Sequence, residues 1–540
     1  MITFDTGNIN GGYAKAIPDN NKKSIWKKLH RWPGLIISFI LLYYGITGIF
    51  MNHRELFSGT DLKREILPEE YSYNNWNNAS LKGNLIINND SILIWGTIGV
   101  WSTDSAFTKF TPVNTGFPKG TDNRRIADLH RTADGNMYTA TLFGLYGWES
   151  ATNSWKKIAG DKNDKRFTGI ESRGDTLYAL SRSMLYTGVS EGVSTLLTVR
   201  ELEAPEGYVS RTGLFETIWQ FHSGEIFGLP GKLFVDLLGL VTIFLSVTGI
   251  IYFFFPGLIK RRMKRNRKAE RLASVSSWSL KWHNKAGEWF FVFLILLYFS
   301  GIFLRPPLLI AIAEAKVKPI KFSHLDQPNP WYDKLRDLVY DHERNIFMLS
   351  TLDGMYIMND PGSRPEACTI QPPVSVMGIN VFEPLGDGSF LIGSFSGIFL
   401  WHPDHPQIYD YAGGTLWQGE PAGRPVGEFK ASGMITDTQG RKYMADYDLG
   451  LIPLHHDGIL PGMPDNILAA SGISLWSVAL EIHTGRIFSF LIGGFYILIV
   501  PLAGLTGVTV VTAGYLLWRK KYRNPLKKAR RQKSSPLLFF

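Results

Sequence analysis

The distribution of apolar residues along the chain predicts four membrane helices. Apolar runs cover residues 32–51, 233–255, 289–304 and 488–518. Each is long enough, or nearly so, to cross the hydrocarbon core of a bilayer, which takes roughly 20 helical residues. Helices buried in a soluble core are the alternative, and four such runs in one chain favour the membrane. No small-residue cleavage site follows the first run, so we interpret it as a retained helix and not as a signal peptide.

The two stretches between paired spans have a different pattern. Each is about 170 residues long and alternates short apolar segments with turns such as Asp134-Gly135-Asn136 and Asp387-Gly388-Ser389. Three such units occur in each stretch, and this strand–turn pattern is typical of propeller blades. Because three blades alone would leave open sheet edges, we predict one composite six-bladed β-propeller. Two separate β domains are the alternative.

These patterns predict a membrane α-helical bundle of two tandem helix pairs with an all-β extracytoplasmic part. The predicted segments are a cytoplasmic tail (1–31), the first span (32–52), a β region (53–215), a histidine box with the second span (216–258), a basic loop (259–281), the third span (282–307), a second β region (308–474), a second histidine box with the fourth span (475–518) and a basic tail (519–540).

Basic residues predict the orientation in the membrane. Residues 22–31 carry five Lys and Arg, residues 260–271 carry eight, and residues 519–533 carry nine. By the positive-inside rule these segments lie in the cytoplasm, which places both termini there and both β regions in the periplasm of a bacterial inner membrane. The rest of the chain is acidic overall. We therefore attribute the positive net charge to membrane topology and lipid contact, and expect no nucleic-acid partner, although a basic tail that binds nucleic acid is an alternative.

Four histidines mark the edges of the four spans. His30 and His283 precede the first and third spans, and His222 and His483 precede the second and fourth. Small-residue–glycine pairs, Thr47-Gly48 and Ser300-Gly301, follow the first two histidines, with each glycine 18 residues further on. Since 18 helical residues rise about 27 Å, these two histidines should lie near the cytoplasmic face.

The two helix pairs have the same topology, so an axis along the membrane normal should relate them. That axis would bring His30 and His283 together on the inner side, and His222 and His483 together on the outer side. Neutral imidazole is a common haem iron ligand, and the arrangement predicts two bis-histidine haems of the b type. The alternative is that each histidine only meets lipid headgroups or caps a helix end.

Several other residues near the predicted helix ends are lesser candidates. His53 follows the first span, has no equivalent after the third, and could be an alternative outer ligand or an interface residue. Asp236 could relay protons or end a helix above the membrane core. Four aromatic residues near the outer histidines could line a haem or anchor at the interface: Trp219, Phe221, Phe227 and Trp476. Further histidines lie in the β regions, and we expect most of these six at the surface: His130, His342, His402, His405, His455 and His456.

At these motifs the chain resembles the PepSY-associated transmembrane family. The matching residues are His30-Arg31-Trp32-Pro33-Gly34 with Thr47-Gly48, and the boxes at residues 222–227 and 483–488. Members are iron-regulated inner-membrane proteins, and some are similar to di-haem reductases of ferric siderophores. The resemblance covers about a third of the chain and implies that His30, His222, His283 and His483 ligate haem iron. We recognise no PepSY domain in either β region.

The expected function is transfer of electrons across the membrane for iron uptake. The cytoplasmic segments contain no Gly-x-Gly-x-x-Gly motif and no P-loop, so a reductase, a flavin or quinol should supply the electrons. The expected acceptor is a ferric siderophore or another Fe(III) chelate, which would make the chain a ferric-chelate reductase. The single cysteine, Cys368, excludes an intrachain disulfide and a cysteine-pair metal site. The alternatives are a haem-free, membrane-anchored propeller that binds or senses a ligand, and a transporter with parallel repeats.

Overall fold

The structure is a computed structural model that describes residues 25–160, 164–419 and 427–523. Contacts divide the described residues into two compact units. One contains the described parts of residues 1–43, 240–302 and 501–540, and is helical. The other contains residues 44–239 and 303–500, and it holds the β sheets together with the adjoining helix ends.

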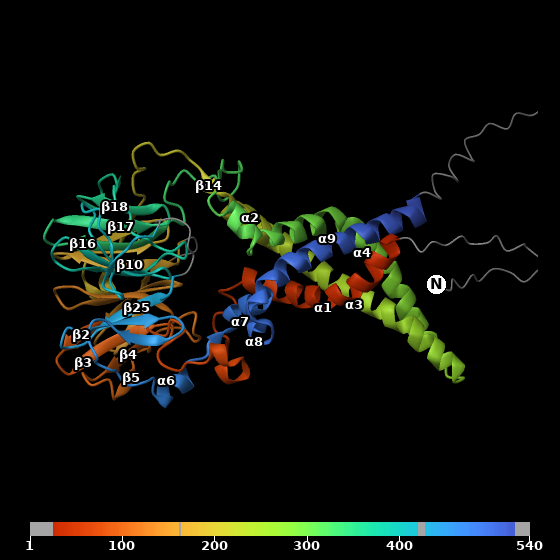
Figure 1. Cartoon of the computed structure of the whole chain (residues 1–540), viewed down its shortest axis with the longest axis horizontal. Helices are drawn as coiled ribbons and strands as arrows, with labels where there is room; N and C mark the ends of the chain where they lie inside the picture. Colours follow the sequence, from red (N-terminus) through yellow and green to blue (C-terminus); the bar gives the residue numbers. More distant parts are fainter. Residues whose placement is uncertain (1–24, 161–163, 420–426, 524–540) are drawn as a thin grey trace, which may run out of the picture. The chain divides into compact units, whose positions relative to one another are not determined.

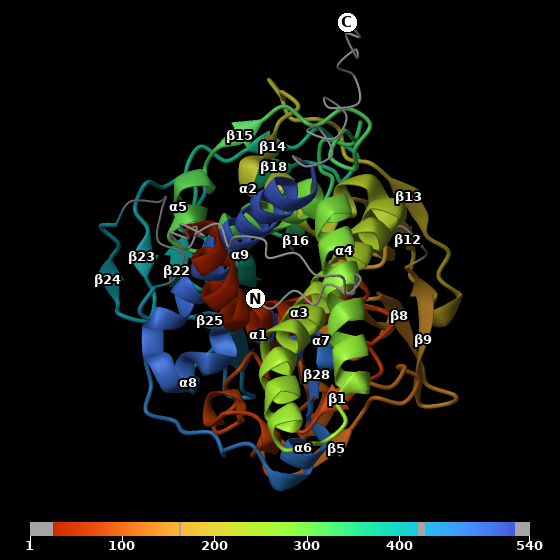
Figure 2. The same cartoon turned by 90° about the vertical axis from the view of Figure 1, so that its right-hand side faces the viewer.

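Four helical segments have the length and apolar composition to cross a membrane, as the sequence predicts. They are Ile25–Asn52, Glu225–Lys264, Glu270–Ile302 and Arg486–Lys521. The α-helices of the described chain are α1 (Ile25–Asn52), α2 (Leu214–Ser223), α3 (Gly228–Lys264), α4 (Glu270–Ile302), α5 (Leu308–Ile312), α6 (Asp465–Ala470), α7 (Leu475–His483), α8 (Ser489–Ile492) and α9 (Ile499–Trp518) (Figures 1 and 2). The chain is therefore a multi-pass membrane protein.

The helices differ from the predicted spans at their ends. α3 continues to Lys264 and α4 begins at Glu270, so most of the predicted loop at 259–281 is helical. Hydropathy marks only the part of a helix that lies in lipid, whereas Lys, Arg and Glu sustain a helix in water equally well. The fourth span is interrupted before α9 at Gly493, whose φ of 54° lies in the left-handed region.

Six small antiparallel sheets form most of the second unit, three in each predicted β region (Figure 1). The first three contain β2 (Gly83–Asn88), β3 (Ser91–Gly96), β4 (Gly99–Thr103) and β5 (Phe110–Pro112); β6 (Ile126–Arg131), β7 (Met137–Thr141), β8 (Gly144–Glu149) and β9 (Ser154–Ala159); and β10 (Phe167–Arg173), β11 (Thr176–Ser181), β12 (Leu185–Val189) and β13 (Thr198–Arg200).

The other three sheets come from the second β region. They contain β16 (Leu335–Asp341), β17 (Ile346–Thr351), β18 (Gly354–Met358) and β19 (Glu366–Ala367); β20 (Ile379–Pro384), β21 (Phe390–Ser394), β22 (Gly397–Trp401), β23 (Tyr409–Asp410) and β24 (Thr415–Leu416); and β25 (Ala431–Thr436), β26 (Lys442–Asp446) and β27 (Gly450–Pro453). Two short ladders connect segments that lie next to the helices, β1 (Asp61–Leu62) with β28 (Ile473–Ser474) and β14 (Thr212–Gly213) with β15 (Lys316–Val317).

The first strands of the six sheets contact one another in sequence order. β2 contacts β6, β6 contacts β10, and so on through β16, β20 and β25, and β25 contacts β2 again. A separate apolar cluster lies between each neighbouring pair of sheets. The cluster between the first and last sheets joins Ile92 and Trp101 to Ile435 and Tyr443, all at most 3% exposed. Apolar burial therefore joins the two β regions into one body.

Polar side chains of the first strands also link neighbouring sheets. Asp128 on β6 accepts a hydrogen bond from the Ile170 N–H on β10 at 2.8 Å. Asn84 on β2 exchanges two hydrogen bonds of 2.7 Å with the backbone of Thr436 on β25. Such bonds satisfy backbone groups that have no partner on a neighbouring strand of their own sheet. They also fix how far one sheet is shifted along its strands relative to the next.

Candidate functional site

The structure brings His30 on α1 and His283 on α4 together. Their ring centres are 6.1 Å apart, and their planes meet at 68°. Nδ1 of His30 lies 2.9 Å from the Val510 carbonyl oxygen on α9. Since a carbonyl only accepts hydrogen bonds, Nδ1 carries the proton, and Nε2 of the neutral ring carries the lone pair. Nδ1 of His283 lies 3.0 Å from Oγ1 of Thr248 on α3.

The second pair, His222 and His483, has nearly the same geometry. The ring centres are 6.5 Å apart with an interplanar angle of 68°. Nδ1 of His483 lies 2.9 Å from Oγ1 of Thr47, and the His483 ring stacks on Tyr44 at 4.8 Å. Thr47 and Thr248, each followed by glycine, thus support one histidine of each pair. The sequence analysis identified the Thr47-Gly48 pair but did not predict that its threonine contacts a histidine.

The local sequence explains why His222 and His483 end their helices. Each is followed by Ser or Thr and then by glycine, and Gly224 and Gly485 adopt φ values of 78° and 75°. A left-handed residue stops an α-helix, and glycine adopts this conformation without steric cost. The His-[Ser/Thr]-Gly box therefore places each histidine in the last turn of a short helix, α2 or α7.

The separation within each pair fits two imidazoles that bind one metal from opposite sides. An imidazole nitrogen lies about 2 Å from its metal and about 1.2 Å from its own ring centre, so the two centres should be about 6.4 Å apart. The observed separations of 6.1 and 6.5 Å lie on either side of this value. Among the described residues, no group of three or more His, Cys, Asp or Glu is placed to hold a metal ion. The arrangement suits a metal whose other ligands come from a cofactor.

Glycines lie against three of the four rings. A Cβ atom at Gly48 would lie 3.5 Å from Cε1 of His483, and one at Gly249 would lie 3.4 Å from Cε1 of His283. At Gly514 the corresponding distance to Cε1 of His30 is 2.8 Å, which is too short for any side chain. The glycines therefore let the helix backbones approach the rings closely, as small residues do between membrane helices.

The lesser candidates near the second pair, His222 and His483, have other partners. Nε2 of His53 lies 2.6 Å from Oδ2 of Asp236, and Asn52 donates to Oδ1 of the same carboxylate at 3.0 Å. The Trp476 indole donates to the Met51 carbonyl oxygen at 3.0 Å. The other three aromatic candidates are exposed by 40–53%, which suits contact with lipid: Trp219, Phe221 and Phe227.

The six histidines named from the β regions have partners within the β part. Nε2 of His130 lies 2.8 Å from Oγ of Ser172, and Nε2 of His456 lies 2.9 Å from the Lys442 carbonyl oxygen. His402 and His405 contact each other with ring centres 4.2 Å apart, while His342 and His455 lie against tyrosines. These contacts are local to the sheets.

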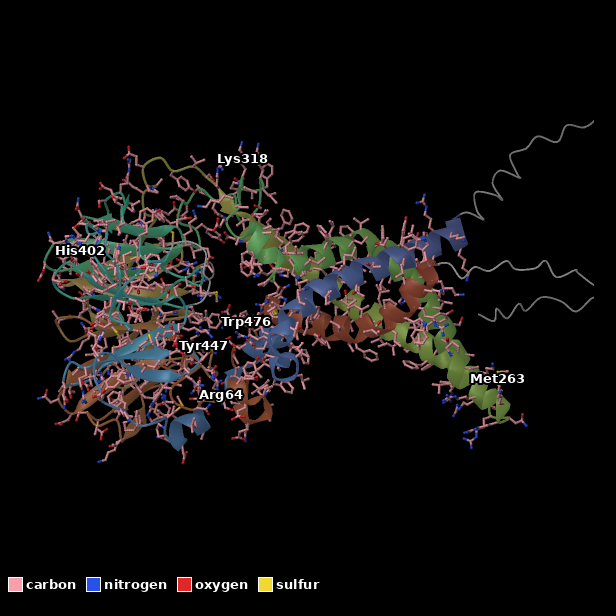
Figure 3. All side chains as sticks on the ribbon, viewed as in Figure 1. Arg64, Met263, Lys318, His402, Tyr447 and Trp476 are labelled. Carbon is pink, nitrogen blue, oxygen red and sulfur yellow. The ribbon has the colours of Figure 1, made fainter. Side chains whose placement is uncertain are left out.

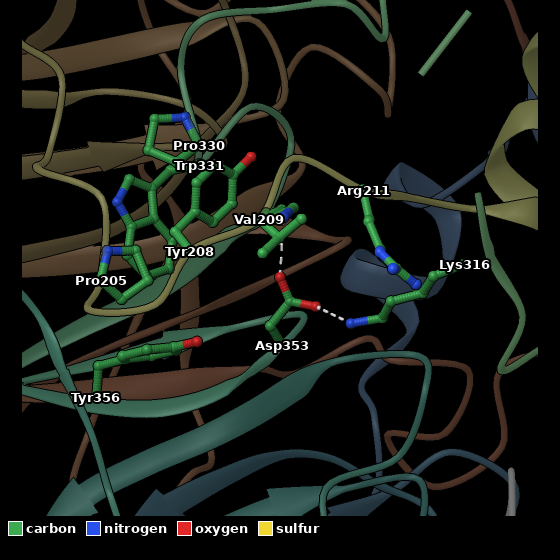
Figure 4. A pocket seen from close by; sticks show the side chains of 10 residues that line it. Pro205, Tyr208, Val209, Arg211, Lys316, Pro330, Trp331, Asp353 and Tyr356 are labelled. Atoms are coloured by element: carbon green, nitrogen blue, oxygen red, sulfur yellow. Dashed lines mark hydrogen bonds and ion pairs between the residues drawn. The ribbon is translucent and has the colours of Figure 1, made fainter. Parts of the chain in front are cut away.

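A cavity of about 320 Å³ lies beside β18 in the second unit (Figure 4). Aromatic walls from Tyr208, Trp331 and Tyr356 surround the Asp353 carboxylate. Asp353 pairs with Lys316 at 3.2 Å and with Lys334 at 2.9 Å. Arg211 also lines the cavity, so one carboxylate faces three cationic side chains and the cavity keeps a net positive charge.

A group of ionisable side chains lies on the first strands of the sheets. Burial and the nearby Asp128 carboxylate raise the pKa of Asp337 to about 8, against the opposing charge of Lys82. Burial raises the pKa of Glu171 to about 7. These acids carry protons at a pH where ordinary carboxyl groups are ionised.

We expect Asp337→Asn to stabilise the protein at pH 8 by about 1–2 kcal/mol. The folded-state pKa of Asp337 is raised, so its contribution is fully present below the unfolded value and is lost as the pH rises toward 8. Asparagine keeps the acceptor for the Leu338 N–H, now at 2.9 Å, and has no proton to lose. Urea unfolding between pH 5 and pH 8 should show a flatter pH dependence for the variant, and parallel profiles for the two proteins would contradict this assignment.

Comparison with known proteins identifies the first half of the chain. A family model described as the PepSY-associated TM region matches residues 10–255. Residues 10–255, a little under half of the chain, are thus similar to the PepSY-associated TM family. The match includes His30, His222 and Thr47-Gly48, so one histidine of each pair lies in the PepSY-associated region. His283 and His483 lie in the second half, beyond the matched residues.

Solved structures resemble the chain only weakly, and no curated protein matches it. The extracellular domain of a protein described as a hybrid two-component system from B. thetaiotaomicron is 12% identical with a TM-score of 0.35, covering 73% of this chain and 35% of that one. A protein of unknown function from Bacteroides thetaiotaomicron is 11% identical with a TM-score of 0.34, covering 69% of each chain. The chain thus spans about a third of the length of the first structure, and such low scores transfer neither fold nor function.

Proposed function

We propose that the protein is a di-haem b electron-transfer protein of the bacterial inner membrane. It takes electrons from a cytoplasmic reductase, a flavin or quinol and passes them to an Fe(III) chelate, such as a ferric siderophore, on the periplasmic side. The main support is the geometry of the two histidine pairs. The ring centres are 6.1 Å apart for His30 and His283 and 6.5 Å apart for His222 and His483, and the interplanar angle is 68° in both pairs. One such pair could arise by chance from helix packing, whereas two in a duplicated unit indicate a shared requirement.

In this proposal His30 and His283 hold one haem, and His222 and His483 hold the other. The iron supplies the one-electron chemistry when the haem is bound. The protein fixes three of the four rings by a hydrogen bond at Nδ1, to the Val510 carbonyl for His30 and to the Thr248 and Thr47 hydroxyls for His283 and His483. Such a bond sets the tautomer and makes Nε2 a stronger donor to iron.

The basic segments support the direction of transfer. By the positive-inside rule, the clusters at residues 22–31, 260–271 and 519–533 would lie in the cytoplasm, together with both termini and the loop between α3 and α4. His30 lies within the first cluster and His283 comes after the second on the same helix as Arg271, so they would form the inner site. His222 and His483 precede helices that run back toward these clusters, so they would form the outer site.

The β part would be a six-bladed propeller over the outer site. Support comes from the six sheets, from the order of contacts that returns from β25 to β2, and from an apolar cluster between each neighbouring pair. Propellers bind ligands without changing shape, and this one would hold the acceptor. Reduction of the bound iron from Fe(III) to Fe(II) weakens its binding to the hard oxygen ligands of the chelator, and the chelator then releases the iron.

The test is a visible spectrum of the detergent-purified protein, oxidised and then reduced with dithionite, with a pyridine-haemochrome count. We expect about two low-spin haems per chain, and re-oxidation of the reduced haems by a ferric chelate. A folded protein without haem, after expression with ample haem supply, would overturn the proposal. The histidines would then be structural, and the β part would act as a membrane-anchored binding module.

A further inference from the structure

We infer that the acceptor is an anionic iron chelate, bound by a cluster of four arginines: Arg54, Arg125, Arg166 and Arg182. The inference rests on the proposed function and names the charge class of its acceptor. Nothing in the motifs of the membrane spans suggested this cluster, because its members come from separate segments of the first β region. We call it the arginine cluster.

The arginine cluster lies where strands of neighbouring sheets begin or end together. Arg125 directly precedes β6 and Arg166 directly precedes β10. The backbone N–H of Arg182, just after β11, donates to the Arg166 carbonyl oxygen at 3.1 Å, so these two residues are neighbours. The bond from the Ile170 N–H on β10 to Asp128 on β6 holds the two sheets at one height, which brings Arg125 to the same end as Arg166.

Two of the four arginines have a carboxylate partner. Arg54 binds Asp122 through two hydrogen bonds of 2.7 Å, and Arg182 binds Asp333 at 2.7 Å. Within the described parts of the chain, Arg125 and Arg166 have no ion pair or hydrogen bond from their side chains. Arg125 and Arg166 are attracted by the Asp122 and Asp333 carboxylates only beyond ion-pair distance, and Lys82 adds a further positive charge beside them, so positive charge is in excess.

The environment of these two side chains favours an anion. Burial lowers the pKa of Arg166, and the positive charges of Arg182, Arg125 and Arg54 lower it further. Burial also lowers the pKa of Arg125, and the charge of Arg54 adds to the effect. Protein atoms surround both side chains on most sides and remove part of their hydration, yet each keeps surface that is accessible to water. Cations that repel one another and remain accessible are stabilised by a bound anion, and planar guanidinium groups bind carboxylates with two hydrogen bonds.

A chain of contacts joins the arginine cluster to the outer histidines. The Arg54 guanidinium carbon lies 3.8 Å from the centre of the Trp476 ring, which Figure 3 labels. Trp476 and His483 both belong to α7, seven residues apart, and therefore about 10 Å along the helix axis. An anion held by the arginines would thus lie within reach of an electron donor at His483.

The test measures binding without any electron transfer. Oxidised protein in phosphatidylcholine nanodiscs is titrated with gallium(III) citrate, a redox-inert and anionic analogue of the ferric chelate, and with a neutral gallium(III) trihydroxamate. The double variant Arg125→Gln/Arg166→Gln should bind the citrate complex at least about tenfold more weakly, and the neutral complex unchanged. Arg131→Gln is the matched control, because Arg131 is exposed at the other end of β6. It should leave citrate binding unchanged.

Two results would overturn the inference. One is equal binding of gallium citrate by the wild type and the double variant. The other is loss of citrate binding by the wild type in nanodiscs rich in phosphatidylglycerol, since a lipid headgroup would then occupy the arginines. Because gallium accepts no electrons, absence of haem would defeat the proposed function and leave this binding measurement intact. If the haem content were normal but gallium citrate binding did not depend on Arg125 and Arg166, only the inference about the arginine cluster would be wrong.

Discussion

Replacing His283 by alanine should remove one haem of two, so that the haemochrome count falls from about two to about one per chain. His30→Ala should give the same difference spectrum, because the rings of His30 and His283 lie 6.1 Å apart and serve one iron. His222→Ala and His483→Ala should share a second difference spectrum, which differs from the one shared by His283→Ala and His30→Ala. A haem held by one histidine would be bound weakly and would lose its low-spin spectrum, so each single substitution should act as a loss of the pair.

A histidine of the β part provides the matched control. His342 contacts the Tyr340 ring and belongs to neither pair, so His342→Ala should retain both haems. Size-exclusion chromatography and circular dichroism should show that every variant is folded. If His30→Ala and His222→Ala gave the same difference spectrum, the assignment of pairs would be wrong.

The second large effect concerns Gly450, where the two β regions join. A Cβ atom at Gly450 would lie 1.5 Å from the Asn75 carbonyl oxygen, and the residue has a φ of 84°. That carbonyl accepts a hydrogen bond from the Leu451 N–H at 3.1 Å, and the Asn78 N–H donates to the Tyr447 carbonyl oxygen at 2.7 Å nearby. A side chain at Gly450 must therefore separate two backbone segments that are hydrogen-bonded to each other.

We expect Gly450→Ala to destabilise the β part by about 3–5 kcal/mol, through strain at positive φ and forced separation of the two segments. Gly440 is the matched control in the same sheet. Its φ is 78°, but nothing lies within 4 Å of its added Cβ, so Gly440→Ala should cost only about 1–2 kcal/mol. Urea unfolding followed by tryptophan fluorescence measures both. Equal losses would mean that the contact with Asn75 does not hold the two regions together.

The sequence alone determined the local features of this protein. Length and hydropathy predicted the four membrane helices, because crossing a bilayer needs a continuous apolar run that no tertiary contact can replace. The repeated boxes at His222 and His483 marked the edges of the second and fourth spans, because a histidine recurs at the same position in each half of the chain. The repeated strand–turn units predicted an all-β part built from small sheets in each half of the chain.

Only the tertiary structure decided which distant residues meet. His30 depends on the Val510 carbonyl, 480 positions along the chain, and His483 on the Thr47 hydroxyl, 436 positions away. The packing of β25 against β2 and the gathering of Arg54, Arg125 and Arg166 likewise depend on how the sheets are arranged. Hydropathy and turn chemistry act over a few residues, whereas these contacts follow from the packing of whole helices and sheets. A sequence pattern therefore identifies the candidate functional side chains, and the fold determines their partners and their charge environment.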